Sequence, residues 1–221
     1  MNEVFESFLS EHNIALSPGQ WDKLSVFEKA LLEKNSVMNL ISPKDEKMIK
    51  TRHVLDSLAA VPVIIKLIKQ GMINPGALIA DCGSGAGFPG MPLAVAFPDF
   101  CFHLLDSLNK RCVFLNDAAA KAGISNVQAM HSRLGEGKPK PSYSLMTERA
   151  MGKLENIMPL CAKELKKGGH FLAWQSLAQV SSDRPELNKA MLKAGLRQAG
   201  KFAYRLPAEE NEKYILIFVK I

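Results

Sequence analysis

The feature that most constrains this chain is a glycine-rich turn that directly follows a short apolar segment. The stretch ALIADCGSGAGFPGMPLA covers residues 77–94, and its apolar run ends at Asp81. Glycines then stand at positions 83, 85, 87 and 90. Glycine adopts backbone conformations that other residues avoid, and it lets the chain come close to another group. The pattern therefore predicts a strand, a tight turn and a helix built around something that the backbone approaches.

After Gly71 the chain alternates between short apolar segments and helical segments. Strands are expected at residues 76–81, 101–106, 126–131, 143–148 and 170–175. Helices are expected at 90–97, 109–123, 154–165 and 185–194, with a Lys-Lys-Gly-Gly turn at 166–169. This alternation predicts an α/β fold with a mostly parallel sheet and helices on both faces. Two closing strands, 197–206 and 212–221, predict an antiparallel hairpin at the sheet edge because no helix separates them.

Residues 1–72 have a helical pattern throughout. Ser17 and Pro18 are an expected N-cap and first helical position, and the amphipathic pattern continues to Asn35. A loop and one or two further helices follow, with a break at Pro62 and a stop at Gly71. We therefore expect two units, a helical extension over residues 1–72 and an α/β domain over residues 73–221.

Composition limits the class of protein further. The chain has 221 residues, 47% hydrophobic and 23% charged, which is typical of a soluble globular protein. No apolar stretch approaches the roughly 20 residues that cross a bilayer, and the first residues lack signal-peptide features. The four cysteines and five histidines are dispersed, so we expect a cytoplasmic protein with free thiols and no metal site. A net charge of +6 is compatible with a polyanionic partner but does not require one.

Two common glycine motifs do not fit the turn. A mononucleotide P-loop needs Lys and Ser or Thr where this chain has Met91 and Pro92. The dinucleotide fingerprint GxGxxG needs a third glycine at position 88, which is Phe88. Backbone amides at a helix N-terminus bind pyrophosphate, and the prolines at positions 89 and 92 remove two such donors. The turn therefore argues against a cofactor that carries phosphate.

A cofactor without phosphate fits the turn better. An amino-acid group could lie against the backbone, and Asp81 could pair with its ammonium directly or through water. Asp106 ends the second strand, where an acid accepts hydrogen bonds from ribose hydroxyls in related folds. S-Adenosylmethionine carries both groups and no phosphate. A tight turn in a domain without a ligand stays open as the plainer interpretation.

Several segments together resemble one known family. The segments DCGSGAGFPGMPLA, NLIS, RHVLDS, LLDSLNKRCVFL and ERA, at these separations, are similar to ribosomal RNA small subunit methyltransferase G, also called glucose-inhibited division protein B. The resemblance runs from about residue 20 to the final strand. It implies a class I, Rossmann-like methyltransferase fold with an N-terminal helical extension. It also implies methyl transfer from S-adenosylmethionine to N7 of one guanine in 16S ribosomal RNA.

The resemblance also implies the residues that contact the cofactor. Residue by residue these are Gly83, Phe88, Leu134, Gly135 and Arg149, with the adenine against Leu134 and Gly135. The general logic of the fold adds Asp81, Gly85, Gly87, Asp106 and Ser107. Guanine N7 is unprotonated at neutral pH, so its methylation needs orientation and exclusion of water rather than a general base. We therefore expect no catalytic acid or base.

Basic residues near the strand ends are the expected contacts to RNA. Lys110 and Arg111 open the helix after the second strand, and Arg133 follows the third strand. Arg149 ends the fourth strand, where its guanidinium could pair with the cofactor carboxylate or with a phosphate.

The segment RHVLDS has two interpretations. Arg52 and Asp56 stand four residues apart, as do His53 and Ser57, so an α-helix would place all four on one face. One interpretation is a surface salt bridge with a solvated histidine. By the resemblance, the segment instead lies over the cofactor crevice as part of a lid, which makes Arg52 and His53 candidate contacts to substrate.

Two positions depart from the resembled family. Gln175 stands where the family usually has lysine, and Glu148 stands where it usually has serine. Gln175 keeps a hydrogen-bond donor without the charge, so it remains a candidate RNA contact. Glu148 places an acid next to Arg149.

We expect a monomer that acts on 16S ribosomal RNA or the small ribosomal subunit, with no membrane partner. Two alternatives stay open from the residues alone. One is a methyltransferase of the same fold that acts on a small molecule or a protein. The other is an RNA-binding module that keeps the fold without turnover.

Overall fold

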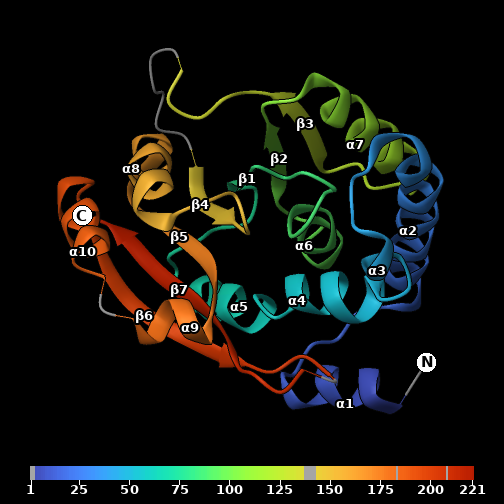
Figure 1. Cartoon of the computed structure of the whole chain (residues 1–221), viewed down its shortest axis with the longest axis horizontal. Coiled ribbons are helices and arrows are strands. Elements are labelled where there is room, and N and C mark those ends of the chain that lie inside the picture. Colours follow the sequence, from blue (N-terminus) through green and yellow to red (C-terminus); the bar gives the residue numbers. More distant parts are fainter. Residues whose placement is uncertain (1–2, 137–142, 183, 208) are drawn as a thin grey trace.

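The computed structural model describes residues 3–136, 143–182, 184–207 and 209–221. Its first part is helical: α1 (Glu3–Glu11), α2 (Pro18–Met38), α3 (Pro43–Glu46), the π-helix η1 (Ile49–Val54), α4 (Leu55–Leu58) and α5 (Val61–Lys69) (Figure 1). Ser17 caps α2 as predicted, because its hydroxyl accepts a hydrogen bond from Gln20 N and its own amide donates to the Gln20 side chain. Among the described helices, none combines the length and the hydropathy needed to cross a membrane.

Seven strands form one sheet in the order β3-β2-β1-β4-β5-β7-β6. The strands are β1 (Leu78–Cys82), β2 (Cys101–Asp106), β3 (Val127–His131), β4 (Tyr143–Glu148), β5 (Leu165–Ser176), β6 (Leu196–Tyr204) and β7 (Lys213–Lys220). All pairs from β3 to β5 are parallel, whereas β7 is antiparallel to both β5 and β6. The connecting helices are α6 (Gly90–Ala96), α7 (Asn109–Lys121), α8 (Leu154–Glu164), α9 (Leu177–Ser181) and α10 (Pro185–Lys193). This confirms the predicted parallel sheet with a C-terminal antiparallel hairpin.

Strand β5 and helix α9 differ from the sequence prediction. The segment 166–169 lies within β5, although its two lysines and two glycines predict a turn. Tyr143 pairs with Leu165 and Leu145 pairs with His170, so β5 accommodates extra residues in an irregularity where Gly168 has φ +77°. The turn prediction was wrong because such an irregularity lets strand pairing resume on both sides of it. Helix α9 was not predicted, although Ser176 and Gln179 form a capping box at its start.

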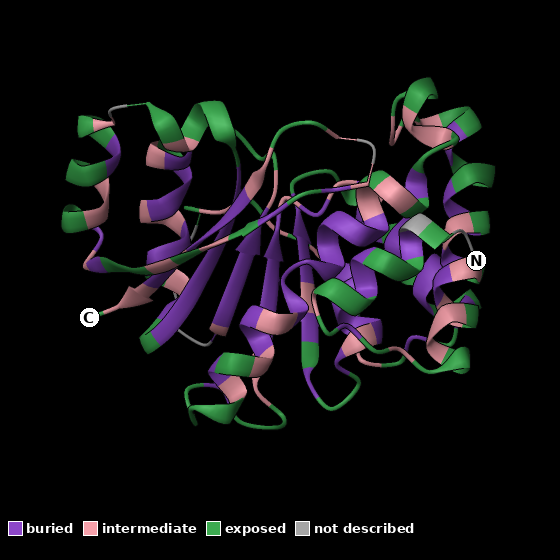
Figure 2. Ribbon diagram, turned by 90° about the horizontal axis from the view of Figure 1, so that it is seen from below, coloured by how far each residue is buried: buried purple, intermediate pink, exposed green. Residues whose placement is uncertain are grey.

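Successive residues of the buried strands pack against opposite faces of the sheet. Leu172 of β5 lies in one hydrophobic core, and its neighbour Phe171 lies in the other. The first core contains the helices before residue 72 together with α6 and α7, and the second contains α8 and residues of α10. Figure 2 shows the central strands buried along most of their length, with helices on both sides. The boundary at residue 72 stays a prediction, and the helices before it share a core with the sheet that follows.

Phe27 of α2 joins the N-terminal helices to the glycine turn. Its ring is fully buried and meets the Phe88 ring edge-on, with 5.5 Å between the ring centroids. A Cβ atom at Gly87 would lie 3.0 Å from Phe27 Cζ, so glycine leaves the space that this ring fills. The N-terminal helices therefore help to fix the shape of the turn.

We predict that Phe27→Ala lowers the free energy of unfolding by about 3–5 kcal/mol, because it leaves a cavity between α2 and the turn. Urea denaturation followed by circular dichroism measures this. Val37→Ala is the matched control on the same helix, since Val37 is 73% exposed, and its effect should stay within about 0.5 kcal/mol. Equal effects of the two substitutions would contradict the role of Phe27.

Candidate cofactor and substrate site

The candidate site is a cleft at the carboxyl ends of the parallel strands. Register pairs Cys82 with both Leu105 and Glu148, and Asp106 with His131, so four strands end at the same edge of the sheet. The cleft has a volume of about 600 Å³. Its wall comes from five parts of the chain. The helical segment before the sheet contributes Leu40, Ile41, Ser42, Asp45, Arg52, His53 and Asp56, and the glycine turn contributes Gly83, Ser84, Gly85, Ala86 and Phe88. The other lining residues are Arg111 of α7, then Glu148, Arg149, Ala150 and Gly152 at the end of β4, and Trp174, Gln175, Ser176, Gln179, Tyr204 and Lys213 from the segments β5 to β7. Open α/β sheets bind ligands at this edge.

The glycine turn is held in shape from two sides. Gly83 has φ +65°, and a Cβ atom there would lie 2.8 Å from Met151 Cγ. On the other side, Asp106 accepts hydrogen bonds from Gly85 N and Leu108 N, both at 2.9 Å. Arg111 adds an ion pair to Asp106 at 3.4 Å. The turn is therefore fixed by the protein itself, with Gly83 and Gly85 on the cleft wall.

Asp81 lies behind this turn and is not among the residues that line the cleft. It is 1% exposed, and its carboxylate accepts hydrogen bonds from Gly90 N at 3.1 Å and the Thr147 hydroxyl at 2.9 Å. A side chain at position 90 would collide with Leu104 and with Asp81, so glycine is needed there. Burial raises the pKa of Asp81 to about 6, although these hydrogen bonds oppose the rise. Asp81 therefore braces the turn from inside.

The first turn of α6 has no free amide to offer a phosphate. The amide of Gly90 donates to Asp81, and the amide of Met91 donates to the Gly87 carbonyl at 2.8 Å. Pro92 has no N–H, and the amide of Leu93 donates to the Pro89 carbonyl at 3.2 Å. Since phosphate sites at helix N-termini depend on such amides, this end of α6 fits a cofactor without phosphate.

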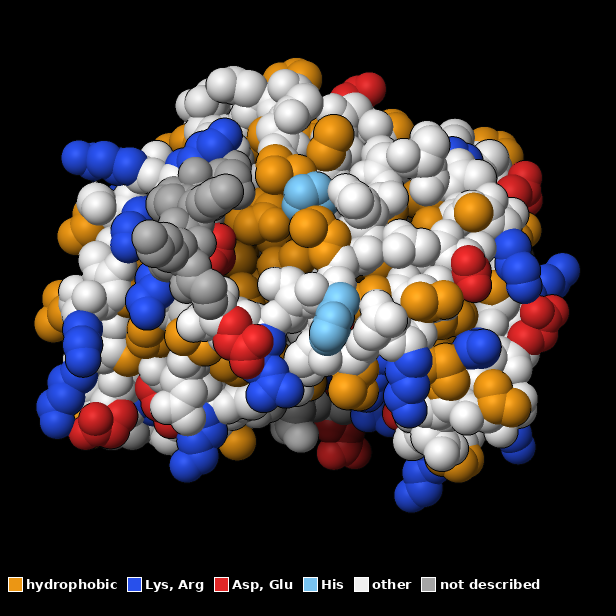
Figure 3. Space-filling model, turned by 90° about the horizontal axis from the view of Figure 1, so that it is seen from above, with side chains coloured by type: hydrophobic (Ala, Val, Ile, Leu, Met, Phe, Trp, Pro, Cys, Tyr) orange, Lys and Arg blue, Asp and Glu red, His pale blue; other side chains and the backbone are white. Residues whose placement is uncertain are grey.

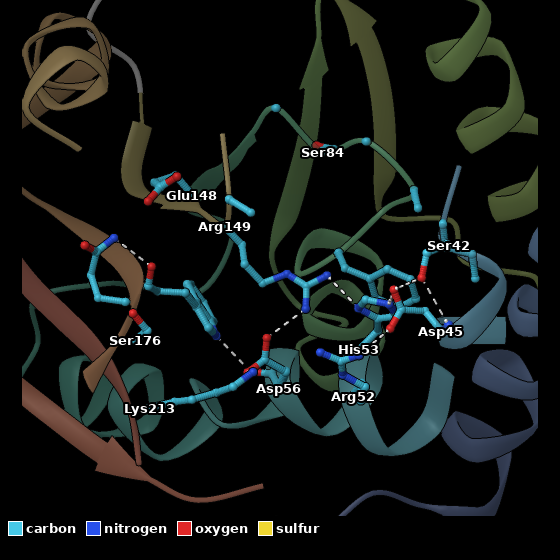
Figure 4. A pocket seen from close by; sticks show the side chains of 18 of the residues that line it. Ser42, Asp45, Arg52, His53, Asp56, Ser84, Glu148, Arg149, Ser176 and Lys213 are labelled. Atoms are coloured by element: carbon cyan, nitrogen blue, oxygen red, sulfur yellow. Dashed lines mark hydrogen bonds and ion pairs between the residues drawn. The ribbon is translucent and has the colours of Figure 1, made fainter. Parts of the chain in front are cut away.

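Asp56 connects the N-terminal helices to the far side of the cleft. It is 4% exposed, and its carboxylate lies 2.8 Å from Arg149 Nη1, 2.6 Å from the Tyr204 hydroxyl and 3.3 Å from Lys213 Nζ. Trp174 Nε1 donates to the Asp56 carbonyl at 2.8 Å. Burial alone would raise the pKa of Asp56, but the two cations and the Tyr204 hydroxyl bring it below its ordinary value. Figure 4 shows Asp56 between Arg149 and Lys213.

His53 and Phe88 form an aromatic pair beside Arg149. Their rings stack with centroids 5.1 Å apart, and the Arg149 guanidinium lies 5.5 Å from the Phe88 centroid. Arg149 Nη2 donates to His53 Nδ1 at 3.1 Å, which requires this ring nitrogen to be unprotonated. Burial and then the Arg149 charge lower the pKa of His53 to about 4, although Asp45 and Asp56 oppose this. His53 is therefore neutral at pH 7.

One of the two interpretations of RHVLDS, a salt bridge between Arg52 and Asp56, is wrong among the described residues. Arg52 instead lies 2.8 Å from Asp45, and 3.7 Å from Glu209 of the β6–β7 connection. Arg52 belongs to π-helix η1, where residues five apart are hydrogen-bonded, so the four-residue spacing of an α-helix does not apply. Asp56 is thereby free to face Arg149. The sequence contains no signal that distinguishes this π-helical turn from an α-helix.

Glu148 lines the cleft at the end of β4 but does not pair with Arg149. It is 1% exposed, and its Oε2 accepts a hydrogen bond from Met151 N at 3.3 Å. In Figure 4 the Glu148 carboxyl group points away from the Arg149 guanidinium. Burial raises the pKa of Glu148 to about 7; the Met151 amide opposes this, and the Asp81 charge adds to it. Sequence reasoning noted an acid here without recognising that it lines the cleft.

The structure brings only part of the predicted site onto the cleft wall. Gly83, Gly85, Phe88, Arg149, Arg52, His53, Arg111 and Gln175 are there, whereas Asp81, Gly87, Asp106, Ser107, Lys110, Arg133, Leu134 and Gly135 are not. Gln175 is buried, and its Oε1 accepts a hydrogen bond from Arg184 Nη1 at 2.8 Å. Leu134 packs partly against the second core, and Arg133 is exposed and paired with Glu136.

Sequence reasoning missed Asp45, Trp174, Tyr204 and Lys213, which come from segments without a recognisable motif. Within the described part of the chain, no cluster of three metal-binding side chains occurs.

A family model described as rRNA small subunit methyltransferase G matches residues 20–200. The chain belongs to this family. Ribosomal RNA small subunit methyltransferase G of Lachnoclostridium phytofermentans is 32% identical over all of this chain and 89% of its own length. The proteins of the same name from Listeria innocua and Staphylococcus saprophyticus are 34% and 35% identical, over 99% and 96% of this chain and 90% and 87% of their own lengths. The predicted family is therefore confirmed, and the chain is a methyltransferase.

Solved structures agree on the fold. TYW2 of M. jannaschii in complex with AdoMet has a TM-score of 0.52 and 14% identity, with 72% of this chain and 76% of that chain covered. The ribosomal protein L11 methylase of Lactobacillus delbrueckii has a TM-score of 0.52 and 16% identity, with 73% and 79% covered. At these identities the similarity shows the fold alone. It confirms the class I methyltransferase fold that the sequence predicts.

We predict that Asp56→Asn lowers the free energy of unfolding by about 3–5 kcal/mol, because it leaves the buried Arg149 guanidinium without its counter-charge. Asp45→Asn is the matched control in the neighbouring segment, where the partner Arg52 is half-exposed, so it should cost less than about 1 kcal/mol. Urea denaturation at pH 7 measures both. If the two variants are equally stable, Asp56 does not have the structural importance assigned here.

Proposed function

We propose that this protein transfers the methyl group of S-adenosylmethionine to N7 of a specific guanine in 16S ribosomal RNA. The observation that carries the proposal is the glycine turn: it lies inside the region matched by the family model, it forms one wall of the cleft, and the helix that follows has no free amide for a phosphate. A cleft of about 600 Å³ is within the range that encloses a cofactor of this size.

Residues on the cleft wall, and others at the neighbouring strand ends that do not line it, are proposed to serve the different chemical groups of the cofactor. Gly83 and Gly85 would lie against its amino-acid end, and Phe88 of the same turn and Arg149 after β4 would contact it as well. Asp106 and Ser107, at the end of β2, are proposed to bind the ribose, and Leu134 and Gly135, after β3, the adenine. We propose that Asp81 and Gly87 act indirectly, since one braces the turn and the other leaves space for Phe27.

The protein contributes orientation and a dry environment rather than proton transfer. The bound cofactor would supply a methyl group activated by its positively charged sulfur. Guanine N7 already carries a lone pair, so the side chains need only align the two groups and exclude water. His53 fits this view, because its pKa of about 4 leaves it neutral and its Nδ1 is already bonded to Arg149. The Phe88–His53 pair is a surface on which a base could stack.

RNA binding is proposed to use basic side chains around the cleft, namely Arg52, Lys110, Arg111 and Arg133, with Gln175 as a neutral contact. The net charge of +6 favours a polyanion. On the face drawn in Figure 3, Lys and Arg side chains are spread among acidic ones, and hydrophobic side chains gather near the middle. We propose that a monomer acts in the cytoplasm on the small-subunit RNA, either free or in a partly assembled subunit.

The first test is methyl transfer. Purified protein is incubated with S-adenosylmethionine carrying a labelled methyl group and with small-subunit RNA that lacks the modification, as free RNA and as subunits. We expect label in 7-methylguanosine after digestion and nucleoside analysis. Measurable cofactor binding without 7-methylguanosine on either substrate would contradict the proposal. Transfer to a protein or small molecule instead would favour the alternative substrate.

The second test concerns the turn. We predict that Gly83→Ala weakens binding of S-adenosylmethionine at least tenfold, because the new Cβ would collide with Met151 and shift the cleft wall. Gly123→Ala is a matched control: its φ of +63° is nearly that of Gly83 at +65°, and its Cβ would meet nothing within 4 Å. Calorimetry on folded variants measures the affinities. An equal loss in both variants, or none in Gly83→Ala, would refute the assignment.

A further inference from the structure

Among the described residues, each charged side chain on the cleft wall forms an ion pair, with one exception. The guanidinium of Arg149 and the ammonium of Lys213 both pair with Asp56. Arg52 pairs with Asp45, and Arg111 pairs with Asp106 just behind the wall. Within the described part of the chain, Glu148 is the lining acid for which no ion pair is found. Its only hydrogen-bond donor there is the Met151 amide.

The position of Glu148 connects it to the glycine turn. It ends β4, where it stands beside Cys82 of β1, the residue just before Gly83. The chain then continues to Met151, whose side chain lies against Gly83. Glu148 is thus a buried acid that faces the part of the cleft next to the turn, where a cationic ligand group would find no other unmatched carboxylate among the described residues.

We propose that Glu148 is the counter-charge for the cationic methionine end of S-adenosylmethionine, an inference that rests on the proposed function. The methionine end carries an ammonium and a sulfonium, each a positive charge. In a buried site, a carboxylate that faces either charge binds it more strongly than a neutral acid does. Glu148 would therefore have to be ionised in the bound state.

Ionisation of Glu148 links cofactor binding to pH. In the free protein the pKa of Glu148 is about 7, so at pH 6 the side chain is mostly protonated. Binding a cation then releases this proton, and affinity rises with pH until Glu148 is ionised beforehand. The groups that face Glu148 are Asp81 and Cys82 from β1, whereas Arg149, Arg111 and His53 lie on other parts of the wall. Asp81 also has a raised pKa and titrates in the same range, so a comparison with a Glu148 variant is needed.

The experiment is calorimetry of S-adenosylmethionine binding at pH 6 and pH 8, in buffers with different ionisation enthalpies, which counts protons exchanged. For the wild type we expect about one more proton released at pH 6 than for Glu148→Gln. We also expect Glu148→Gln to bind at least tenfold more weakly at pH 8. Glu148→Asp should keep the proton release, and the exposed Glu186→Gln on α10 should match the wild type. The cofactor's own amino group titrates near pH 8, so proton release is compared at pH 6, where this group is already protonated.

The protein without its ligand offers a second readout. A buried acid with a raised pKa stabilises the fold below its unfolded pKa of about 4.5, and this contribution is lost as the pH rises through about 7. The wild type should therefore lose stability relative to Glu148→Gln as the pH rises from 5 to 8, measured by thermal unfolding of the cofactor-free proteins. Parallel stability curves would remove the basis of the proposal.

S-Adenosylhomocysteine, which keeps the ammonium and lacks the sulfonium, separates the two cationic groups. If its binding also depends on Glu148, the ammonium is the partner; if only S-adenosylmethionine depends on Glu148, the sulfonium is. Either result supports the proposal. Equal affinity and equal proton release in wild type and Glu148→Gln would overturn this inference alone. Failure of the wild type to bind either compound would overturn the proposed function together with it.

Discussion

The structure of the cleft depends on the buried carboxylate of Asp56. It contacts Arg149 at the end of β4, Tyr204 of β6 and Lys213 of β7, and its carbonyl accepts a hydrogen bond from Trp174 of β5. One residue of a short helix thus connects the N-terminal helices to four strands. Because a buried charge without a partner is costly, the fold depends on these contacts to hold the Asp56 carboxylate. The position of Arg149, and of the Phe88–His53 pair beside it, follows from this carboxylate.

A second buried acid explains why a turn so rich in glycine is suited to a cofactor without phosphate. Asp81 binds the amide of Gly90, which in a phosphate-binding turn would face the ligand. The sequence predicted this selectivity from Pro89 and Pro92, which remove amide donors. The structure adds a reason that the sequence did not reveal: the remaining amides are already bonded within the protein. The Asp81 carboxylate that holds the turn in shape therefore also occupies an amide that a phosphate would need.

The parts predicted well from sequence depend on local patterns, and the parts missed depend on distant contacts. Strands β2 and β4 have the predicted bounds, because each is a short and mostly buried run with several apolar residues. The partners of Asp56 lie 93, 148 and 157 residues away, and no local signal predicts them. The interpretation that paired Arg52 with Asp56 was wrong because a π-helical turn looks like an α-helix in sequence. Gln175 and Glu148 were noticed only as departures from a family pattern, which gave their positions without their contacts.

Three acids near one cleft have different pKa values because their surroundings differ, and each suits a different task. Asp56 has two cations and a hydroxyl, so it remains ionised and holds Arg149 in place. Burial raises the pKa of Asp81 to about 6 while it braces the turn, because its neutral hydrogen-bond donors offset only part of the cost of burial. Glu148 has a single backbone amide and the highest pKa of the three, at about 7. A carboxyl group with a pKa near 7 in the free protein can lose its proton when a positively charged ligand binds. Asp56 and Asp81 already have partners within the protein. The number and charge of the groups around each acid therefore distinguish Asp56 and Asp81, which hold the cleft in shape, from Glu148, which is proposed to bind the ligand.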